Sequence, residues 1–349
     1  MAERPYLVGV DIGSSAIKLC HLKDVRGQRT LVRFGYQPLP PRAIEDGKIK
    51  DPVTVISALE RVFSENKVRR RDVALSVSGH SVIIKRITLP LLSDAELREQ
   101  INWEASQQIP FDINDVAMDY EVLRRHADQG QMDVLLVAAK KDDLNEAVEL
   151  ARKAKLRPVV IDVDAFSVQN AFEVNYGLPS EGTVALVNVG ATLSTVNILN
   201  AGIPAFTRDI ATGGNAFTDD VMKQVGVSFD EAERFKIGGV GVPVPAEVAG
   251  ILQASAESLA GEIQRSLDFY LATSGEREIS HIYLAGGTSN VQELLEAIQR
   301  RARTVVERMD PLRQIAVDPK DVDHELLRAH AAQATVALGL ALRREREAR

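Results

Sequence analysis

The chain has 349 residues, more than the roughly 250 to 300 at which a single hydrophobic core stops growing, so we expect two domains. Its hydrophobic content of 45%, charged content of 26% and net charge of −7 are typical of a soluble globular protein and argue against nucleic acid as the main partner. The single cysteine, Cys20, excludes an internal disulfide and falls on an apolar strand, where we expect a buried thiol.

The first part of the chain predicts a β-β-β-α-β unit from its short alternating apolar segments. The unit comprises strands near 6–10, 15–22 and 30–37, a helix near 52–66 and a strand near 73–77. Residues 81–161 follow a different pattern, which predicts a small α+β module inserted into the first domain. Within it, Ser93 or Asp94 caps a helix with Glu96 in its first turn, and a strand at 158–162 completes the module.

The second half begins with a helix near 165–174 that leads to strands within residues 183–207. That stretch carries no charge over 25 residues, but its asparagines, glycines and proline and its alternating pattern favour strands over a membrane span. The later pattern predicts a strand near 281–285 and helices near 216–225, 246–273, 291–301 and 326–347.

The segment LVGVDIGSSAIKLCHL, residues 7–22, predicts a strand, a tight turn and a second strand. Gly13 allows the backbone to approach a ligand closely, and Ser14 and Ser15 add hydroxyl and N–H groups that suit a phosphate. Asp11 ends the first strand, where a carboxylate can hold a hydrated divalent cation. Taken alone, the same residues are also typical of an ordinary hairpin turn.

The chain repeats this hairpin in its second half. Aligning Asp11 with Asn188 superimposes residues 7–22 on VALVNVGATLSTVNIL, residues 184–199. Gly13 then falls on Gly190, and apolar residues match at most strand positions. Such an internal duplication predicts two related domains whose hairpins face each other across a cleft and hold one polyphosphate between them.

Two glycine pairs add to this pattern. Gly213 and Gly214 precede a helix, and Gly286 and Gly287 follow a short strand. Strand, glycine pair and helix N-terminus together suit close contact with a ribose, a planar base or an anion.

These features occur in the order that is typical of the actin, heat-shock chaperone and sugar kinase superfamily, which the chain resembles over nearly its whole length. The resemblance implies an α/β, actin-like, two-domain fold with a duplicated ribonuclease H-like core. The inserted module sits where the cell-division protein FtsA carries its distinctive subdomain. The implied boundaries are a first domain of residues 1–80, 162–182 and 330–349, an FtsA-like insertion of 81–161, and a second domain of 183–329 with a small helical lobe near 215–275.

Three further segments resemble the PilM family of type IV pilus assembly proteins. They are INWEASQQIPFDINDVAMDYEVL, residues 101–123, DVDAFSVQNAFEVNYG, residues 162–177, and ATVALGLALR, residues 334–343. The resemblance implies that the chain binds ATP or ADP with Mg²⁺, which Asp11 would hold through water. The implied nucleotide-binding residues are Asp11, Gly13, Ser14, Ser15, Lys18, Asn188, Gly190, Ala191, Thr192, Gly213, Gly214, Asn215, Glu233, Lys236, Gly286, Gly287 and Thr288.

One position departs from the superfamily pattern. The second hairpin commonly bears an acid, and this chain has the neutral Asn188 there. That departure favours a protein that holds ATP with at most slow hydrolysis. No general base is evident; Asp162 and Asp164 lie near the position where the superfamily activates water, but carboxylates are favoured at any helix start.

The resemblance also implies a place and partners. PilM proteins lie at the cytoplasmic face of the bacterial inner membrane and receive the N-terminal cytoplasmic tail of PilN, which implies support of pilus extension, retraction and twitching. We expect Ile109, Pro110 and Phe111 to border the groove for that tail, PilO and PilP to be reached indirectly, and the motor ATPases to be further partners. Contact with the membrane would be only through partners. The alternatives are an FtsA-like polymerising ATPase, a type II secretion inner-membrane platform component and a small-molecule kinase.

Overall fold

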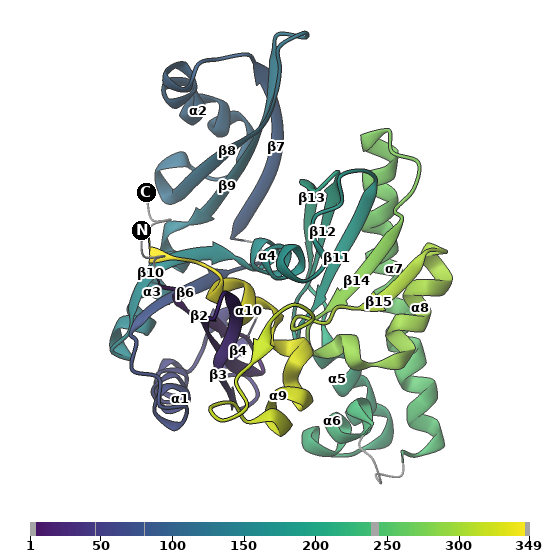
Figure 1. The fold of residues 1–349 in the computed structure, drawn as a ribbon. Helices are drawn as coiled ribbons and strands as arrows, with labels where there is room; N and C mark the ends of the chain where they lie inside the picture. The colour runs from purple at the N-terminus through teal and green to yellow at the C-terminus, as the bar shows by residue number, and fades with distance from the viewer. Residues whose placement is uncertain (1–4, 46, 80, 239–243, 346–349) are drawn as a thin grey trace.

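The computed structural model describes residues 5–45, 47–79, 81–238 and 244–345. Two large mixed sheets lie side by side, and a small three-stranded sheet rises from one of them (Figure 1). Helices α4 (Asp164–Tyr176) and α10 (Thr335–Ala341) lie between the two large sheets. Their apolar side chains pack with residues of both sheets, so these helices connect the two halves of the molecule.

Five strands of the first large sheet have the same order as the five strands of the second. The first runs β3-β2-β1-β6-β10, with β16 added beyond β3, and the second runs β13-β12-β11-β14-β15. The hairpin registers also agree, because Asp11 pairs with Lys18 on β2 as Asn188 pairs with Thr195 on β12. The duplication that the sequence predicts is therefore present in the strand pairing.

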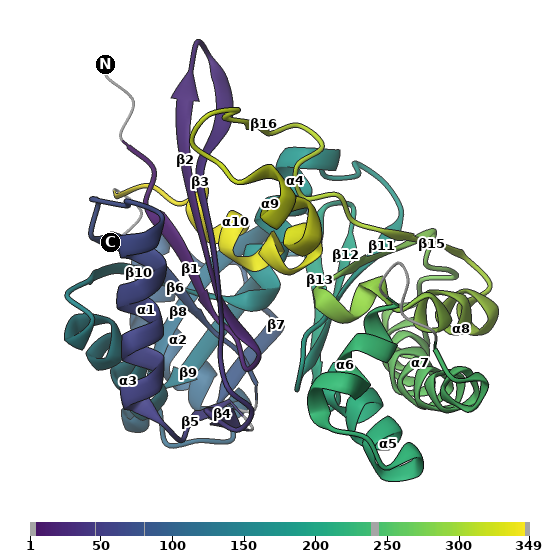
Figure 2. The ribbon, with the colours of Figure 1, turned by 90° about the horizontal axis from the view of Figure 1, so that it is seen from below.

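The first sheet is built from β1 (Val8–Ile12), β2 (Ala16–Val25), β3 (Gln28–Pro38), β6 (Asp72–Val77), β10 (Arg157–Val163) and β16 (Ala316–Val317). Helices α1 (Pro52–Glu65) and α3 (Lys141–Lys153) cover its outer face (Figure 2). A two-stranded ribbon, β4 (Ile44–Glu45) and β5 (Lys48–Ile49), lies before α1. Alternate residues of β1 and β2 face α1, so the apolar alternation in the sequence becomes this core.

The second sheet is built from β11 (Thr183–Val189), β12 (Ser194–Asn200), β13 (Ile203–Ile210), β14 (His281–Ala285) and β15 (Val305–Arg308). Helices α5 (Gly214–Val225), α7 (Ala246–Ser274) and α8 (Gln292–Ala302) cover its outer face, and α6 (Phe229–Ile237) packs on α5. The charge-free stretch 183–207 forms strands, as the sequence predicts. None of the described helices is both long and apolar enough to cross a bilayer.

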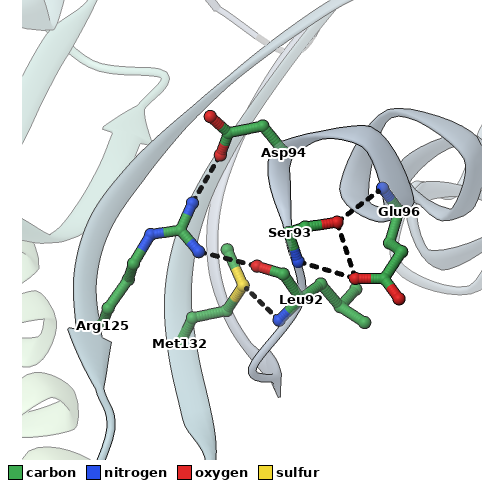
Figure 3. Close-up of polar contacts among 6 residues, drawn as sticks. All are labelled: Leu92, Ser93, Asp94, Glu96, Arg125 and Met132. Atoms are coloured by element: carbon green, nitrogen blue, oxygen red, sulfur yellow. Dashed lines mark hydrogen bonds and ion pairs between the residues drawn. The ribbon is translucent and has the colours of Figure 1, made fainter.

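The inserted module is the sheet β7-β9-β8, made of β7 (Val82–Pro90), β8 (Val116–His126) and β9 (Gln131–Lys140), with α2 (Asp94–Gln108) and the 3-10 turn Ile113–Asp115. Ser93 caps α2 and forms a reciprocal pair of hydrogen bonds with Glu96 (Figure 3). Arg125 of β8 bonds Asp94 at 2.5 Å and the Leu92 carbonyl at 2.6 Å, so the start of α2 is tied to the sheet.

Three expected boundaries differ from the structure. Strand β10 pairs with β6 and α3 packs on α1, so both belong to the first domain rather than to the inserted module. Strand β16 pairs with β3, so the chain returns to the first domain before residue 329. The helix expected at 326–347 is broken into α9 (His324–His330), the 3-10 turn Ala331–Ala334 and α10, and residues 346 and 347 lie outside the described residues.

Helix α10 packs unusually closely on its neighbours because it carries small residues at the contacts. A Cβ on Gly339 would lie 1.8 Å from the Ser167 carbonyl oxygen of α4, and one on Gly9 of β1 would lie 2.0 Å from the Ala337 carbonyl oxygen. Neither position has room for a side chain unless backbone moves. The spacing between α4, α10 and the first sheet therefore depends on these two glycines.

Gly339→Ala should destabilise the protein by about 1–3 kcal/mol or more, because the added methyl group overlaps backbone atoms that cannot rotate away. Gly250→Ala is the matched control, since a Cβ at that position of α7 meets nothing within 4 Å. It should stabilise by up to about 1 kcal/mol through helix propensity. Urea unfolding measures both variants, and equal midpoints would contradict the close packing.

Candidate functional site

The turn of the first hairpin is organised by a buried ion pair. Lys18 Nζ lies 2.7 Å from Asp11 Oδ2, and both side chains are largely withdrawn from solvent. Lys18 Nζ also donates to the Ala16 carbonyl at 3.1 Å, and a Cβ on Gly13 would lie 2.6 Å from Nζ. A lysine on an alternating strand usually faces solvent, so its burial here identifies a positive charge held directly beneath the turn.

The turn of the second hairpin is held by the start of α5. The amides of Gly214 and Asn215 donate to the Gly190 and Ala191 carbonyls at 2.9 and 2.7 Å. A Cβ on Gly213 would lie 2.6 Å from the Gly190 carbonyl oxygen, which explains why glycine stands there. The glycine pair that the sequence assigns to a ligand thus first serves to seat the helix on the hairpin.

The second glycine pair supports the same hairpin from the other side. Gly286 has φ +85°, and a Cβ there would lie 2.4 Å from the Val189 carbonyl oxygen. The buried Thr288 donates its hydroxyl to the Gly190 carbonyl at 3.0 Å. Thr288 therefore braces the hairpin, and a role in ligand binding would be additional.

The two hairpin turns meet across the domain boundary. Ser14 Oγ and Thr192 Oγ1 lie 2.8 Å apart and share a hydrogen bond. They belong to the separate duplicated units; Ser14 directly follows Gly13, and Thr192 comes two residues after Gly190. The sequence prediction that the hairpins face each other agrees with this contact.

Glu233 and Lys236 tie α6 to α5, with the side chain of Lys236 8% exposed and that of Glu233 26% exposed. Lys236 Nζ bonds the Gly214 carbonyl at 3.1 Å, the Thr218 hydroxyl at 2.9 Å and the Glu233 carboxylate. Burial lowers the pKa of Lys236, and the adjacent Glu233 opposes that effect. The pair holds α6 against the start of α5, next to the second hairpin.

The two candidate bases differ in their surroundings. Asp162 is buried and paired with Arg343 at 2.8 Å, and burial raises its pKa while Arg343 opposes the rise. Asp164 instead accepts from Ser76 at 2.5 Å and faces Asp11 and Asp209. Burial, with the negative charges of those two carboxylates, raises the pKa of Asp164 to about 7. Of the two, only Asp164 shares its surroundings with the first hairpin.

Asp209 of β13 is a member of this cluster that the sequence reasoning did not select. Its carboxylate accepts from the Gly79 amide of the first domain at 2.8 Å and from Thr195 at 2.7 Å. It therefore bridges the two domains. Asp209 is the cross-strand partner of Thr195 on β12, a pairing that the sequence pattern alone does not reveal. Residues 78–79, β7 and β13 line a cavity of about 170 Å³ at this point.

A second cavity of about 320 Å³ lies between β7 and β13, lined by Ile84, Lys85, Arg86, Leu135, Pro204, Ala205, Phe206 and Thr207. Ile109 is buried in the core of the inserted module, while Pro110 is exposed and Phe111 lies under Lys140, whose Nζ is 4.4 Å from the ring centroid. Neither cavity is lined by residues 109–111.

Among the described residues, no three histidine, cysteine or carboxylate side chains are placed to hold a metal ion by themselves. Asp11 is the carboxylate next to the first turn, and its Oδ2 is engaged by Lys18. One carboxylate beside a turn of small residues fits Mg²⁺, which usually keeps several waters and binds through substrate phosphates.

Comparison with protein families decides what kind of protein carries this site. The model of the family "Type IV pilus assembly protein PilM" matches residues 9–345. The chain belongs to the PilM family of type IV pilus assembly proteins. A solved PilM–PilN type IV pilus biogenesis complex is similar to it with 27% identity and a TM-score of 0.85, covering 97% of this chain and 98% of that one.

Two more distant structures share the fold. The ethanolamine utilization protein EutJ from Carboxydothermus hydrogenoformans is 15% identical with a TM-score of 0.59, covering 97% of this chain and 90% of that one. MreB5 of Spiroplasma citri bound to AMPPNP is 12% identical with a TM-score of 0.52, covering 97% and 95%. The actin-like fold expected from the sequence is confirmed for this PilM family member.

The raised pKa of Asp164 gives a pH dependence of stability. The folded state binds this proton more tightly than the unfolded chain, whose aspartate has a pKa near 3.8, so the free energy of unfolding falls as pH rises toward about 7. Asp164→Asn should remove this slope, which is up to about 1.4 kcal/mol per pH unit. Urea unfolding at a series of pH values measures it.

The control is Asp142→Asn, an exposed carboxylate in the first turn of α3, which should leave the slope of the wild type unchanged. If the Asp164→Asn curve runs parallel to the wild-type curve between about pH 5 and 6.5, the carboxylate does not hold a proton in the folded state.

Proposed function

We propose that this PilM family member is a nucleotide-binding adaptor of type IV pilus assembly, which holds ATP or ADP with Mg²⁺ between its two domains and binds the N-terminal tail of PilN. The observation that supports this most directly is the contact of the two hairpin turns at Ser14 and Thr192. Small residues with hydroxyl and N–H groups from two domains meet at one point, which is the arrangement that a polyphosphate requires.

The first turn would hold the phosphates. Ser14 and Ser15 offer amides and hydroxyls, and Lys18 offers a positive charge that is buried and already positioned. A phosphate entering between the turns would replace the hydrogen bond of Ser14 with Thr192. Lys18 would then share its charge between Asp11 and the phosphate, which leaves Asp11 able to hold a Mg²⁺-bound water.

The ribose and base would lie against the second domain. Gly214 and Gly286 contact the second hairpin directly, and the Glu233–Lys236 pair is bonded to the start of α5 beside it. Solved MreB5 structures contain AMPPNP or ADP, and that protein shares the fold. Asn188 in place of a second acid supports holding the nucleotide with slow hydrolysis at most, and Asp164 is the carboxylate that would accept a proton if hydrolysis occurs.

Lys18→Met should weaken ADP binding at least about tenfold, because it removes a charged hydrogen-bond donor from the phosphates. Lys23→Met is the control, since Lys23 lies on the same strand and is exposed. Isothermal titration calorimetry measures the affinity. The melting temperature without ADP separately reports the cost of leaving Asp11 unpaired, and equal affinity of both variants would contradict the assignment.

The groove between β7 and β13 suits the PilN tail. Both strands are at the edge of their sheets, and consecutive residues of each line the groove, so backbone edges as well as side chains are presented. An extended peptide can pair with such an edge while its apolar side chains contact Ile84 and Phe206. The similarity to a solved PilM–PilN complex supports a peptide partner of this kind.

Ile84→Glu should reduce binding of a peptide of the PilN N-terminal tail by at least about tenfold, because it places a charge against an apolar contact. Phe111→Ser tests the location that the sequence suggests, beside Lys140 of β9 and outside the lining of the groove, and should leave binding within about twofold. Fluorescence anisotropy measures both. Loss with Phe111→Ser but not with Ile84→Glu would move the groove to residues 109–111.

This proposal extends to the protein's place in the cell. A PilN-bound adaptor would lie at the cytoplasmic face of the inner membrane, touch PilO and PilP through PilN, act with the motor ATPases, and support twitching. ATP-dependent polymers in a pelleting assay would instead favour the FtsA-like alternative.

A further inference from the structure

A row of polar side chains crosses the first sheet toward the second domain. Asp11 on β1, Lys18 on β2 and Tyr36 on β3 are direct cross-strand partners, so their side chains lie on one face. Lys18 is held by Asp11. Tyr36 is half-buried, and burial together with the charge of Glu233 from the second domain raises its pKa. The row therefore leads from the first hairpin turn, which would hold the phosphates, toward α6 of the second domain.

His330 extends this row beyond the sheet. It ends α9, and its ring stacks on Tyr36 with the centroids 3.7 Å apart and the planes at 10°. Burial lowers the pKa of His330, the positive charge of Lys18 adds to the effect, and the neighbouring Gln333 amide opposes it. The charged and titratable groups around this ring are therefore Lys18 from β2, Tyr36 from β3 and, facing Tyr36, Glu233 from α6.

Gln333, three residues later, lies against the second glycine pair. A Cβ on Gly287 would be 2.9 Å from Gln333 Nε2, and the Gly286 amide donates to the Ala332 carbonyl at 3.1 Å. This short segment therefore fills the space between the phosphate turn and the Gly286–Gly287 turn.

Two atoms of the segment are unsatisfied. His330 Nδ1 and Gln333 Oε1 are both buried, and neither has a partner at hydrogen-bond distance and angle within the part of the chain that the structure describes. The two side chains lie close to each other, because contact with the Gln333 side chain raises the pKa of His330 against the effect of burial. A buried polar atom without a partner costs about 1–3 kcal/mol, so such atoms are uncommon unless a ligand or water completes them. Here two of them occur three residues apart, between the two turns that would hold opposite ends of a nucleotide.

We propose that His330 and Gln333 are nucleotide-binding residues, in which His330, held by its stack on Tyr36, donates from Nδ1 to a phosphate near Lys18, and Gln333 accepts from a ribose hydroxyl near Gly287. The inference rests on the proposed nucleotide site and assigns to it a third wall, contributed by the segment between α9 and α10. The ligand class is a nucleoside di- or triphosphate, because the segment lies between β2, which carries Lys18, and the Gly286–Gly287 turn.

If His330 binds the phosphate, the affinity for ADP should depend on pH in a way that a purely structural role of His330 would not produce. Without ligand, burial and the charge of Lys18 lower the pKa of His330 and so favour the neutral ring. A phosphate beside Nδ1 favours the protonated ring, so binding takes up a proton and ADP should bind more tightly as pH falls. By linkage, this contribution disappears when residue 330 cannot titrate.

The experiment measures ADP and adenosine affinities by calorimetry at about pH 6 and about pH 8 for the wild type and three variants. His330→Gln keeps a hydrogen-bonding side chain but cannot titrate. His324→Gln is the matched control, because His324 begins the same helix and is exposed. Gln333→Met removes Oε1 with little change in volume. The phosphate of ADP titrates equally in every variant, so only differences between variants are diagnostic.

We expect His330→Gln to weaken ADP at least about tenfold at pH 6 while changing adenosine by less than about twofold, and to flatten the pH dependence relative to His324→Gln. Gln333→Met should weaken both ligands by about three- to tenfold, and it carries the test if His330→Gln does not fold. Wild-type affinities and pH profiles in both His330→Gln and Gln333→Met would overturn the inference but leave the nucleotide site standing. Absence of ADP binding in the wild type would overturn both.

Discussion

The buried ion pair of Asp11 and Lys18 is the interaction on which the candidate site depends. A buried carboxylate without a partner would cost several kcal/mol, so Lys18 is held under the first turn as long as Asp11 is ionised. The pair keeps a positive charge close to a turn made of small residues, and the register of β1 with β2 fixes where that charge lies. A polyphosphate can use this charge without reorganising the turn, which is why we regard the turn as prepared for a ligand rather than as an ordinary hairpin.

The turn of the second hairpin is held in place by different interactions. Its equivalents of Asp11 and Lys18 are Asn188 and Thr195, which are neutral, so backbone contacts take the place of the ion pair. The start of α5, Thr288 and Gly286 hold this hairpin through its carbonyls. Thr195 is then free to bond Asp209, which also receives the Gly79 amide beside β7. The nucleotide hairpin and the groove along β7 and β13 are thus joined through a single carboxylate, a physical route by which one ligand can affect the other.

The sequence predicts what depends on local pattern. The duplicated hairpin, the contact between its two copies, the capping of α2 by Ser93 and the extent of α7 follow from glycines, alternation and capping residues near each other in the chain. It does not predict features set by long-range contacts. The burial of Lys18, the pairing of β10 with β6 and the stack of His330 on Tyr36 each join segments that only the tertiary fold brings together. The break between α9 and α10 is of the same kind, because its apolar pattern is compatible with one continuous helix.

The central claim is that the cleft binds nucleotide, and the melting temperature of nucleotide-free protein with and without Mg-ATP tests it most directly. A ligand at about 100 times its Kd adds about 2.7 kcal/mol to the free energy of unfolding. With an unfolding entropy of about 2.1 cal/mol/K per residue, a cooperative chain of 349 residues should melt about 4 °C higher. We predict a rise of this size with Mg-ATP and also with ADP. Tripolyphosphate, which lacks adenosine, should not fully reproduce it. An unchanged melting temperature at millimolar Mg-ATP would contradict the account and leave a PilM family member that acts as a static adaptor.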